Sequence, residues 1–369
     1  MSRVVRTRRA GRAASHRDER ARQLVVRADP RNVESARRAL GAYLTPAADR
    51  FVRSNFAVPR LRLRDHRVRV GGLVQQPLHL DVEELRSLPQ RTVTVTTECA
   101  GNGRTDLSPL PPGEPWQGGA VSTARWTGVA LPLLLERAGI RPGAMEVLAT
   151  GADSGPVALG HAAYARSVPL ATALDPDTIV ALEMNGRPLL AAHGAPVRLV
   201  VPGWYGMASV KWLSQLEVVG ERFAGYFQSH RYVYREPGKA PEPVTRMRVK
   251  SMFTAPLDGS RVEMGPLRVG GFAWSGTGRI ARVEVAFAGG EEWIEARLAA
   301  DGESHAWRGW ELIWTPPWRG RHVLRCRATD DAGNVQPDAG RWNELGYGAN
   351  GVQSIAVYAS RLIRRRGRR

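Results

Sequence analysis

The chain has 369 residues, of which 43% are hydrophobic and 24% are charged, a composition typical of globular proteins. No apolar run approaches the roughly 20 residues that a membrane-spanning helix needs, so an integral membrane protein is not expected. Two cysteines, Cys99 and Cys326, allow at most one disulfide, which argues against a small secreted scaffold held by disulfides. The length is enough for two domains.

The formal net charge of +18 is concentrated at the two ends of the chain. Residues 1–23 carry eight Arg against one Asp and one Glu, and residues 359–369 carry six Arg and no acid. Runs of like charge usually form solvated tails, with nucleic acid or an anionic membrane as the alternative partner. Because little excess charge remains on the body, we do not expect a nucleic-acid-binding protein.

The first residues include Arg8 and Arg9, as a twin-arginine export signal does, but the residues that follow are polar and charged rather than apolar. No export signal is evident. The expected location is therefore the cytoplasm, or the periplasm or another compartment outside the cytoplasm if the start of translation is misassigned.

Residues 1–45 predict a basic, partly disordered segment with a short helix near its end. Asp29 supplies an N-cap and Pro30 a first helical residue. The stretch NVESARRALGAYL, residues 32–44, continues with helical spacing.

Residues 46–240 mix strand and helix patterns, which predicts one α+β domain. RLRLRDHRVRVGG at 60–72 and RTVTVTTEC at 91–99 alternate as strands do. Short helices are expected after the capping residue Asp81 and in LPLLLERAG, which ends at Gly139.

The segment EPGKAPEP at 236–243 has the composition of a linker and marks the boundary between two domains. Residues 241–358 contain six or seven short alternating runs separated by Gly, Asp and Pro. This spacing predicts an immunoglobulin-like β-sandwich. Residues 359–369 form the second basic tail.

Cys99 lies at the end of the strand predicted at 91–99. By strand parity it is simply the next core residue after Val95 and Thr97. The alternative is a functional thiolate, because the pattern stops at Cys99 and runs into Ala-Gly-Asn-Gly-Arg. The glycines permit a tight turn, and Arg104 brings positive charge close to the sulfur. The residues alone leave both interpretations open.

The motif ECAGNGR at 98–104, followed by PWQGGAVSTARWTGVALPLLLERAG, resembles the molybdopterin domain of the sulfite oxidase family and of the related plant-type nitrate reductases. Residues 181–218, with HGAPVR and VKWL, and FQSHRY at 227–232 are similar to further stretches of that domain. GFAWSG and WNELGYGANGVQ resemble the family's immunoglobulin-like dimerisation domain. The resemblance covers residues 46–358 and implies a molybdopterin cofactor with molybdenum, and a homodimer through the second domain.

Carried onto this sequence, the resemblance makes Cys99 the thiolate that binds molybdenum beside the two dithiolene sulfurs of the pterin. Such a soft ligand suits this metal. The resemblance also implies a catalytic pocket for the substrate that contains Arg53, Arg104, Trp116 and Tyr232.

Five positions match cofactor contacts of the family: Asn55, Asp153, His193, Arg198 and Lys211. Asn55 stands where relatives have a His. Without the resemblance, the histidine would be an ordinary loop residue, the arginine and lysine surface charges, and the aspartate a turn residue.

The resemblance implies two-electron oxygen-atom transfer, with oxidation of sulfite to sulfate as the first expectation. Sulfite oxidases have an Arg where this sequence has Leu345, and an Arg where it has Gly103. A sulfoxide or other oxo-acid reductase is therefore the alternative. A catalytically silent, Ig-containing binding protein with basic tails is a second alternative, from another class. No haem or flavin domain is evident, so we expect a separate electron-transfer partner such as a cytochrome.

Overall fold

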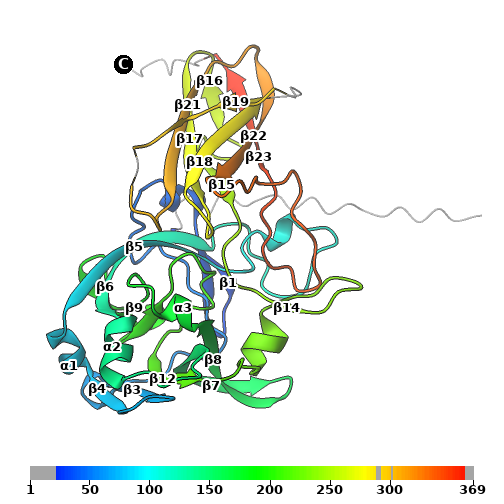
Figure 1. Ribbon diagram of the computed structural model, residues 1–369. Helices are drawn as coiled ribbons and strands as arrows, with labels where there is room; N and C mark the ends of the chain where they lie inside the picture. Colours follow the sequence, from blue (N-terminus) through cyan, green and yellow to red (C-terminus); the bar gives the residue numbers. More distant parts are fainter. Residues whose placement is uncertain (1–21, 288–291, 301, 362–369) are drawn as a thin grey trace, which may run out of the picture.

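The computed structural model describes residues 22–287, 292–300 and 302–361, which form two lobes (Figure 1). The larger lobe contains all the α-helices of the described chain, and the smaller lobe is built from strands. This arrangement confirms the predicted fold class, a mixed helix-and-strand domain followed by a β-sandwich. Within these ranges no helix has the length and apolar character needed to cross a membrane.

The two main helices of the larger lobe begin and end where the sequence predicts. α1 (Val82–Ser87) follows Asp81, whose side chain accepts a hydrogen bond from the Glu84 amide while the Glu84 side chain accepts one from the Asp81 amide. α2 (Leu131–Ala138) ends at Gly139, which has a φ of 69° that residues with a side chain rarely adopt. Local capping chemistry therefore defines both helices.

Two five-stranded sheets build the larger lobe. The first has the order β10-β9-β6-β5, with β11 also paired to β9. Its strands are β5 (Gln90–Glu98), β6 (Val121–Ala130), β9 (Ile179–Met184), β10 (Arg187–Pro188) and β11 (Arg198–Val200). The second has the order β4-β3-β12-β7-β8. Its strands are β3 (Arg67–Gly72), β4 (Leu78–Asp81), β7 (Glu146–Val157), β8 (Gly160–Pro169) and β12 (Leu213–Val219). The short α3 (Leu170–Ala173) follows β8.

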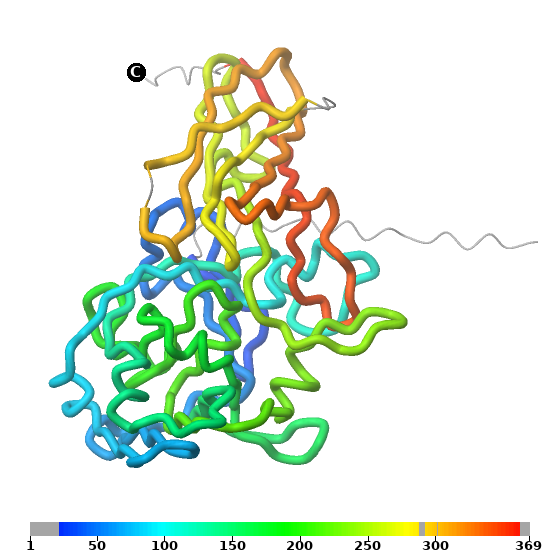
Figure 2. Tube along the Cα trace, in the orientation of Figure 1, coloured from blue at the N-terminus to red at the C-terminus, as the bar shows by residue number. Residues whose placement is uncertain are grey.

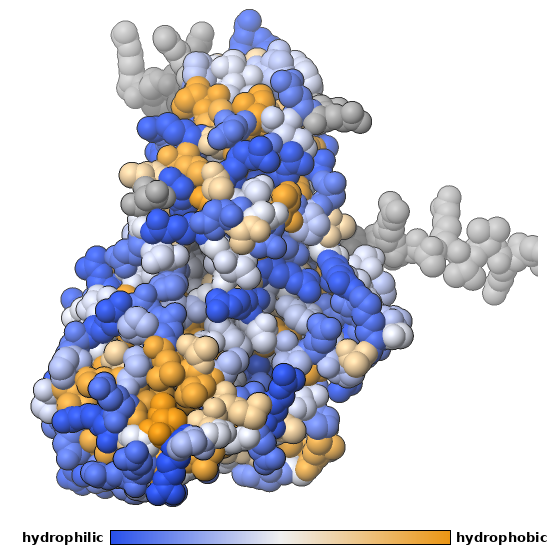
Figure 3. Space-filling view, in the orientation of Figure 1, coloured by the Kyte–Doolittle hydropathy of each residue, from blue (hydrophilic) through white to orange (hydrophobic). Residues whose placement is uncertain are grey.

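The main hydrophobic core lies in this lobe and joins both sheets to α2. Its buried members include Val68, Val129, Leu134, Val147 and Leu216. Burying such a side chain stabilises a fold by about 1.5–3 kcal/mol. Apolar side chains also gather on the surface over α2 and α3 (Figure 3). The core makes a rigid support from which the connecting loops project.

The helix expected within residues 32–44 was wrong. Asn32–Ser35 is strand β2, which pairs antiparallel with β1 (Gln23–Arg27), and only a 3-10 turn at Arg37–Leu40 follows. All four residues of β2 are buried, so tertiary packing outweighs the helical preference of the sequence. The disordered segment expected before this hairpin falls on residues 1–21, which lie outside the described residues.

The smaller lobe is the predicted sandwich of two sheets. One has the order β15-β17-β21-β20 and consists of β15 (Lys250–Ala255), β17 (Leu267–Trp274), β20 (Arg297–Leu298) and β21 (Arg308–Trp314). The other has the order β16-β23-β22-β18-β19 and consists of β16 (Arg261–Glu263), β18 (Ile280–Phe287), β19 (Ile294–Glu295), β22 (Gly320–Asp330) and β23 (Gln353–Ser360). Cys326 is buried between them, in the core. The small pair β13 (Val233–Tyr234) and β14 (Glu242–Pro243) precedes this lobe.

The smaller lobe covers the free edge of β5. The amide of Thr94 donates to Glu303 Oε2 at 2.8 Å, and the amide of Thr96 donates to the carbonyl of His305 at 2.9 Å. The orange-red segment before β23 also returns to the larger lobe (Figure 2). There the amide of Gly348 donates to the carbonyl of Ala100 at 2.8 Å. The end of β5 is thus held by both lobes.

Candidate active site

Cys99 is the first residue after β5, and its side chain is 6% exposed. Its amide donates to the carbonyl of Ala120 at 2.8 Å. The chain then turns, with the amide of Asn102 donating to the carbonyl of Cys99 at 2.9 Å and Gly103 at a φ of 78°. Cys99 lines a cavity, whereas Cys326 is buried in the sandwich core. The tight turn after the strand therefore presents Cys99 to the cavity.

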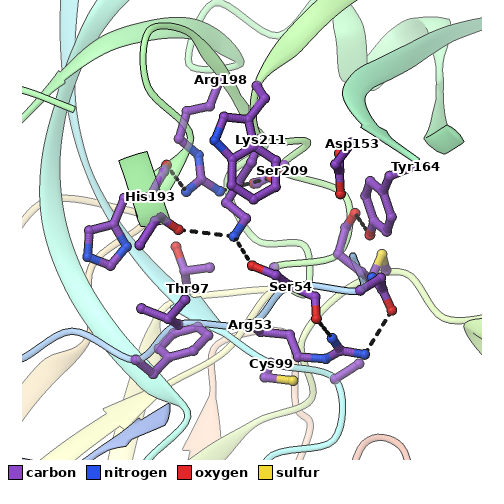
Figure 4. Close-up of a pocket in the computed structure, with 18 of the residues that line it drawn as sticks. Arg53, Ser54, Thr97, Cys99, Asp153, Tyr164, His193, Arg198, Ser209 and Lys211 are labelled. Carbon is purple, nitrogen blue, oxygen red and sulfur yellow. Dashed lines mark hydrogen bonds between the residues drawn. The ribbon is translucent and has the colours of Figure 1, made fainter. Parts of the chain in front are cut away.

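The cavity next to Cys99 has an empty volume of about 670 Å³, including its opening to solvent. This volume is in the range of cofactor and ligand sites. The cavity brings together eight of the ten predicted site residues: Arg53, Asn55, Cys99, Asp153, His193, Arg198, Lys211 and Tyr232. Figure 4 labels all of them except Asn55 and Tyr232. The eight residues come from the segment before β3, the end of β5, β7, the 3-10 turn Ala191–His193, β11 and the segments on either side of β12.

One end of the cavity is basic. Lys211 Nζ donates to Ser54 Oγ at 2.7 Å and to the carbonyl of Ala192 at 3.0 Å (Figure 4). Its neighbour Trp212 has a φ of 51°, which is uncommon for a residue with a large side chain. Arg198 donates from Nη1 to the carbonyl of His193 and from Nη2 to the carbonyl of Ser209, both at 2.9 Å. Both cations therefore have neutral partners.

Arg50, which the sequence analysis missed, adds a further buried cation to this end. Its Nη1 atom has no hydrogen-bond partner among the described residues. Burial lowers the pKa of Arg198 to about 10, and burial together with Arg198 lowers the pKa of Lys211 well below its usual value. Such desolvated cations need an anion to compensate them. This end of the cavity is suited to a phosphate or a similar anionic group.

Burial shifts the pKa values of two other titratable groups at this end. Burial, followed by Arg50, lowers the pKa of His193 to about 3, so its ring is neutral and Nε2 lies 3.1 Å from the carbonyl of Ala47. Burial raises the pKa of Asp153 to about 6, although Lys211 opposes that shift. The aspartate is the only acidic residue among the described residues that line the cavity. The cavity therefore carries a net positive charge.

The other end of the cavity contains Arg53 and Tyr232 beside Cys99. Arg53 Nη2 donates to Asn55 Oδ1 at 2.8 Å, and Asn55 Nδ2 donates to the Tyr232 hydroxyl at 3.1 Å. Burial raises the pKa of the Cys99 thiol, while Arg53 and the Gly101 amide act in the opposite direction. Asn55, predicted as a cofactor contact, here connects two residues predicted to contact the substrate.

Arg104 and Trp116, predicted for the substrate pocket, do not line the cavity. Arg104 donates from Nη1 to the carbonyl of Glu114 at 2.6 Å and from Nη2 to the carbonyl of Leu345 at 3.0 Å. Trp116 is buried in a cluster with Phe51 and Cys99. Both residues therefore support the turn around Cys99 instead of facing the cavity. Arg104 does so through its hydrogen bonds to backbone carbonyls, and Trp116 through its packing.

Residues other than Arg50 were also missed. Tyr164 lines the cavity from β8 and donates to the carbonyl of Met207 at 2.7 Å. Ser54 and Ser209 line it as well. The closeness of Arg50 and Ser54 to Arg53 in the sequence was a usable signal, whereas a tyrosine in an alternating strand gives none.

The donor set fits the cofactor that the resemblance implies. Within the described ranges there is no group of three or more His, Cys, Asp or Glu side chains that could hold a metal ion. The cavity instead offers one thiol at Cys99 and a basic end with the unpartnered Nη1 atom of Arg50. These residues suit a metal that arrives with sulfur ligands of its own on an anionic carrier, as molybdenum does on molybdopterin.

Comparisons with known proteins point to the same cofactor. Residues 55–227 match the family model "Oxidoreductase molybdopterin binding domain", and residues 242–359 match "Mo-co oxidoreductase dimerisation domain". Mitochondrial sulfite oxidase of Rattus norvegicus is 38% identical over 341 residues, which is 86% of this chain and 62% of that protein. Sulfite oxidase of Gallus gallus is 39% identical over 328 residues, which is 82% of this chain and 71% of that protein.

Among solved structures, the sulfane dehydrogenase SoxCD from Paracoccus pantotrophus superposes with a TM-score of 0.82 at 29% identity. The match covers 96% of this chain and 92% of the other. Both lobes therefore have a counterpart in a solved structure, whereas the chain spans less than two thirds of the rat enzyme's length.

Proposed function

Because the chain belongs to the sulfite oxidase family of molybdopterin-dependent oxidoreductases, we propose that it catalyses two-electron oxygen-atom transfer, with oxidation of sulfite to sulfate as its reaction. The observation that carries this proposal is a single cavity that holds the Cys99 thiol beside Arg53 at one end and several buried cations at the other. When bound, the molybdenum cofactor supplies the metal that exchanges the oxygen atom and accepts the electrons.

The residues of this chain would bind and orient both groups. Lys211, Arg198 and Arg50 would hold the anionic part of the cofactor by charge-assisted hydrogen bonds. Cys99 would bind the metal as a thiolate, since a metal removes the thiol proton that burial otherwise retains. Arg53 and the Tyr232 hydroxyl would orient the substrate oxygen atoms.

A less charged substrate, such as a sulfoxide, is the second candidate. Two observations on Leu345 and Arg104 favour it. Leu345 stands where sulfite oxidases have an Arg and carries no charge, and Arg104 does not line the cavity but donates from both Nη atoms to backbone carbonyls. Fewer cations than expected therefore face the substrate.

For its partners, we propose a homodimer formed through residues 242–359 and a separate electron acceptor such as a cytochrome. The match of these residues to a dimerisation domain supports the dimer. Sedimentation of the purified protein at micromolar concentration tests it, and a monomer at every concentration would contradict it.

The function is tested by purifying the protein from a host that makes molybdopterin, and by measuring molybdenum per chain and sulfite-dependent reduction of cytochrome c. We expect close to one metal atom per chain and turnover that Cys99→Ser abolishes. Cys326→Ser is the matched control, because this cysteine lies in the sandwich core, and it should keep turnover. Folded protein without molybdenum would overturn the assignment to this enzyme class. Loaded enzyme that reduces sulfoxides and ignores sulfite would overturn only the choice of substrate.

A further inference from the structure

We propose that Glu114 is a specificity-determining residue, a built-in counter-ion of Arg53 that favours singly charged or neutral substrates over doubly charged oxyanions. The inference rests on the proposed function, because that function assigns Arg53 to the substrate end of the cavity. Glu114 is not among the residues that line the cavity, but its carboxylate lies beside the Arg53 guanidinium.

The Glu114 carboxylate sits between two arginines. Its Oε2 atom is 3.8 Å from Arg53 Nη2, and its Oε1 atom is 3.4 Å from Arg27 Nη1. Asn32 Nδ2 also donates to Oε1 at 3.4 Å. Arg27 and Asn32 belong to the β1–β2 hairpin, so that hairpin holds the carboxylate against the site.

Glu114 is only 7% exposed, yet it is ionised. Burial acts to raise its pKa, but Arg53, a hydrogen bond from its own backbone amide, Arg231 and Arg104 together outweigh burial, and the pKa is lowered. A buried, ionised carboxylate keeps its charge at neutral pH and acts through a medium less polar than water. Its field therefore reaches the substrate end of the cavity.

The Arg53 guanidinium is already engaged by the protein. Nη1 donates to the carbonyl of Ser54, and Nη2 donates to Asn55 Oδ1 while facing Glu114. An oxyanion that approaches Arg53 from the cavity meets a cation whose charge is partly compensated. The repulsion between Glu114 and the ligand is proportional to the ligand's charge, so a dianion is penalised twice as much as a monoanion.

Two tetrahedral anions of similar shape and different charge test this inference. The binding of sulfate and perchlorate to the molybdenum-loaded protein is measured by calorimetry, for the wild type and for Glu114→Gln. We expect the Kd to fall by about 5-fold for perchlorate and about 25-fold for sulfate, because the effect on the free energy doubles with the charge. The KM for sulfite should fall in parallel while kcat changes little.

Glu136→Gln is the matched control, since it removes the same charge from an exposed position on α2. It should leave both Kd values unchanged. Arg27→Gln provides a variant at a half-exposed side chain that does not depend on altering a buried group. It frees the carboxylate from one of its cations, so the Kd of sulfate should rise by about 2- to 3-fold.

Equal changes in Kd for the two anions, or no change, would overturn the role of Glu114, because a purely structural effect does not scale with ligand charge. The result is separable from the proposed function. If the loaded protein does not oxidise sulfite but Glu114→Gln lowers the Kd of sulfate more than that of perchlorate, the proposed reaction is contradicted and the role of Glu114 is supported. If the protein oxidises sulfite but the two Kd values change equally, the reaction is supported and the role of Glu114 is contradicted.

Discussion

Lys250 of the smaller lobe donates from Nζ to Glu98 Oε1 at 3.3 Å, one residue before Cys99. Glu98 is 1% exposed, and its carboxylate also accepts from Trp274 Nε1 and Asn102 Nδ2, both at 2.9 Å. Lys250 Nζ donates in addition to the carbonyl of Ala349 at 2.6 Å. A buried ion pair with such neutral partners is satisfied, and it fixes the turn that carries the cysteine to the second lobe.

Lys250→Met is expected to destabilise the cofactor-free protein by about 3–5 kcal/mol, because it leaves Glu98 buried without its counter-ion. The free energy of unfolding in urea measures this effect. The double variant Glu98→Gln/Lys250→Met removes both charges and should recover most of the loss. If the double variant is less stable than Lys250→Met, the unpaired charge of Glu98 is not the cause of the lost free energy of unfolding.

Arg53→Gln and Trp116→Phe should separate binding from packing. Arg53 lines the cavity, so its loss should raise the KM for sulfite by about 10-fold or more, as expected when a charge-assisted contact is lost. Trp116 is packed behind Cys99, so Trp116→Phe should cost about 1–3 kcal/mol of stability with a smaller effect on KM. Steady-state kinetics and thermal unfolding measure the two effects. A larger KM effect at the tryptophan would contradict this division.

Lys211→Met should weaken cofactor retention. The loss of a charge-assisted contact worth about 1.5–3 kcal/mol corresponds to roughly 10- to 100-fold in affinity. Molybdenum remaining after extended dialysis gives the measurement. Lys239→Met, at an exposed lysine, should retain the wild-type content. Equal loss from both variants would show that general instability, and not the basic end of the cavity, causes the release.

The neutral ring of His193 predicts that the cofactor-free protein loses stability in acid. Its pKa of about 3 in the folded state lies below the unfolded value near 6.5, so the unfolded chain binds more protons between these values. Stability from this group is complete above pH 6.5 and falls by about 2 kcal/mol from pH 7 to pH 5. Urea unfolding at the two pH values measures the fall, and His193→Gln should reduce it by that amount. An unchanged pH dependence in that variant would assign the fall to other groups.

Local chemistry was predictable from the sequence. Asp81 as a cap, Gly139 as a terminator and the end of a strand at Cys99 all depend on neighbours within a few residues, and all three are confirmed. The strand predicted over 60–72 is shorter, since only β3 at its end finds a partner. Strand pairing, unlike capping, is decided by distant residues.

Contacts between distant parts of the chain were not predictable. The carbonyl of Leu345 occupies Arg104 across 241 positions of sequence, and Lys250 meets Glu98 across 152. Neither contact can be predicted from the residues next to it in the sequence. The family resemblance identified most of the residues of the cavity, but it gave no indication that Arg104 would point away from the cavity or that Glu114 would lie beside Arg53.

The covering of β5 by the smaller lobe has a mechanical consequence. Thr94, Thr96 and Glu98 are alternate residues of one strand, and each is bonded to the smaller lobe just ahead of the sulfur of Cys99. A strand that is hydrogen-bonded to the smaller lobe at three alternate positions moves with that lobe. A tilt of one lobe against the other would therefore displace the sulfur of Cys99. The lobe that matches a dimerisation domain therefore holds the strand that leads to Cys99, and the two lobes do not act as independent modules.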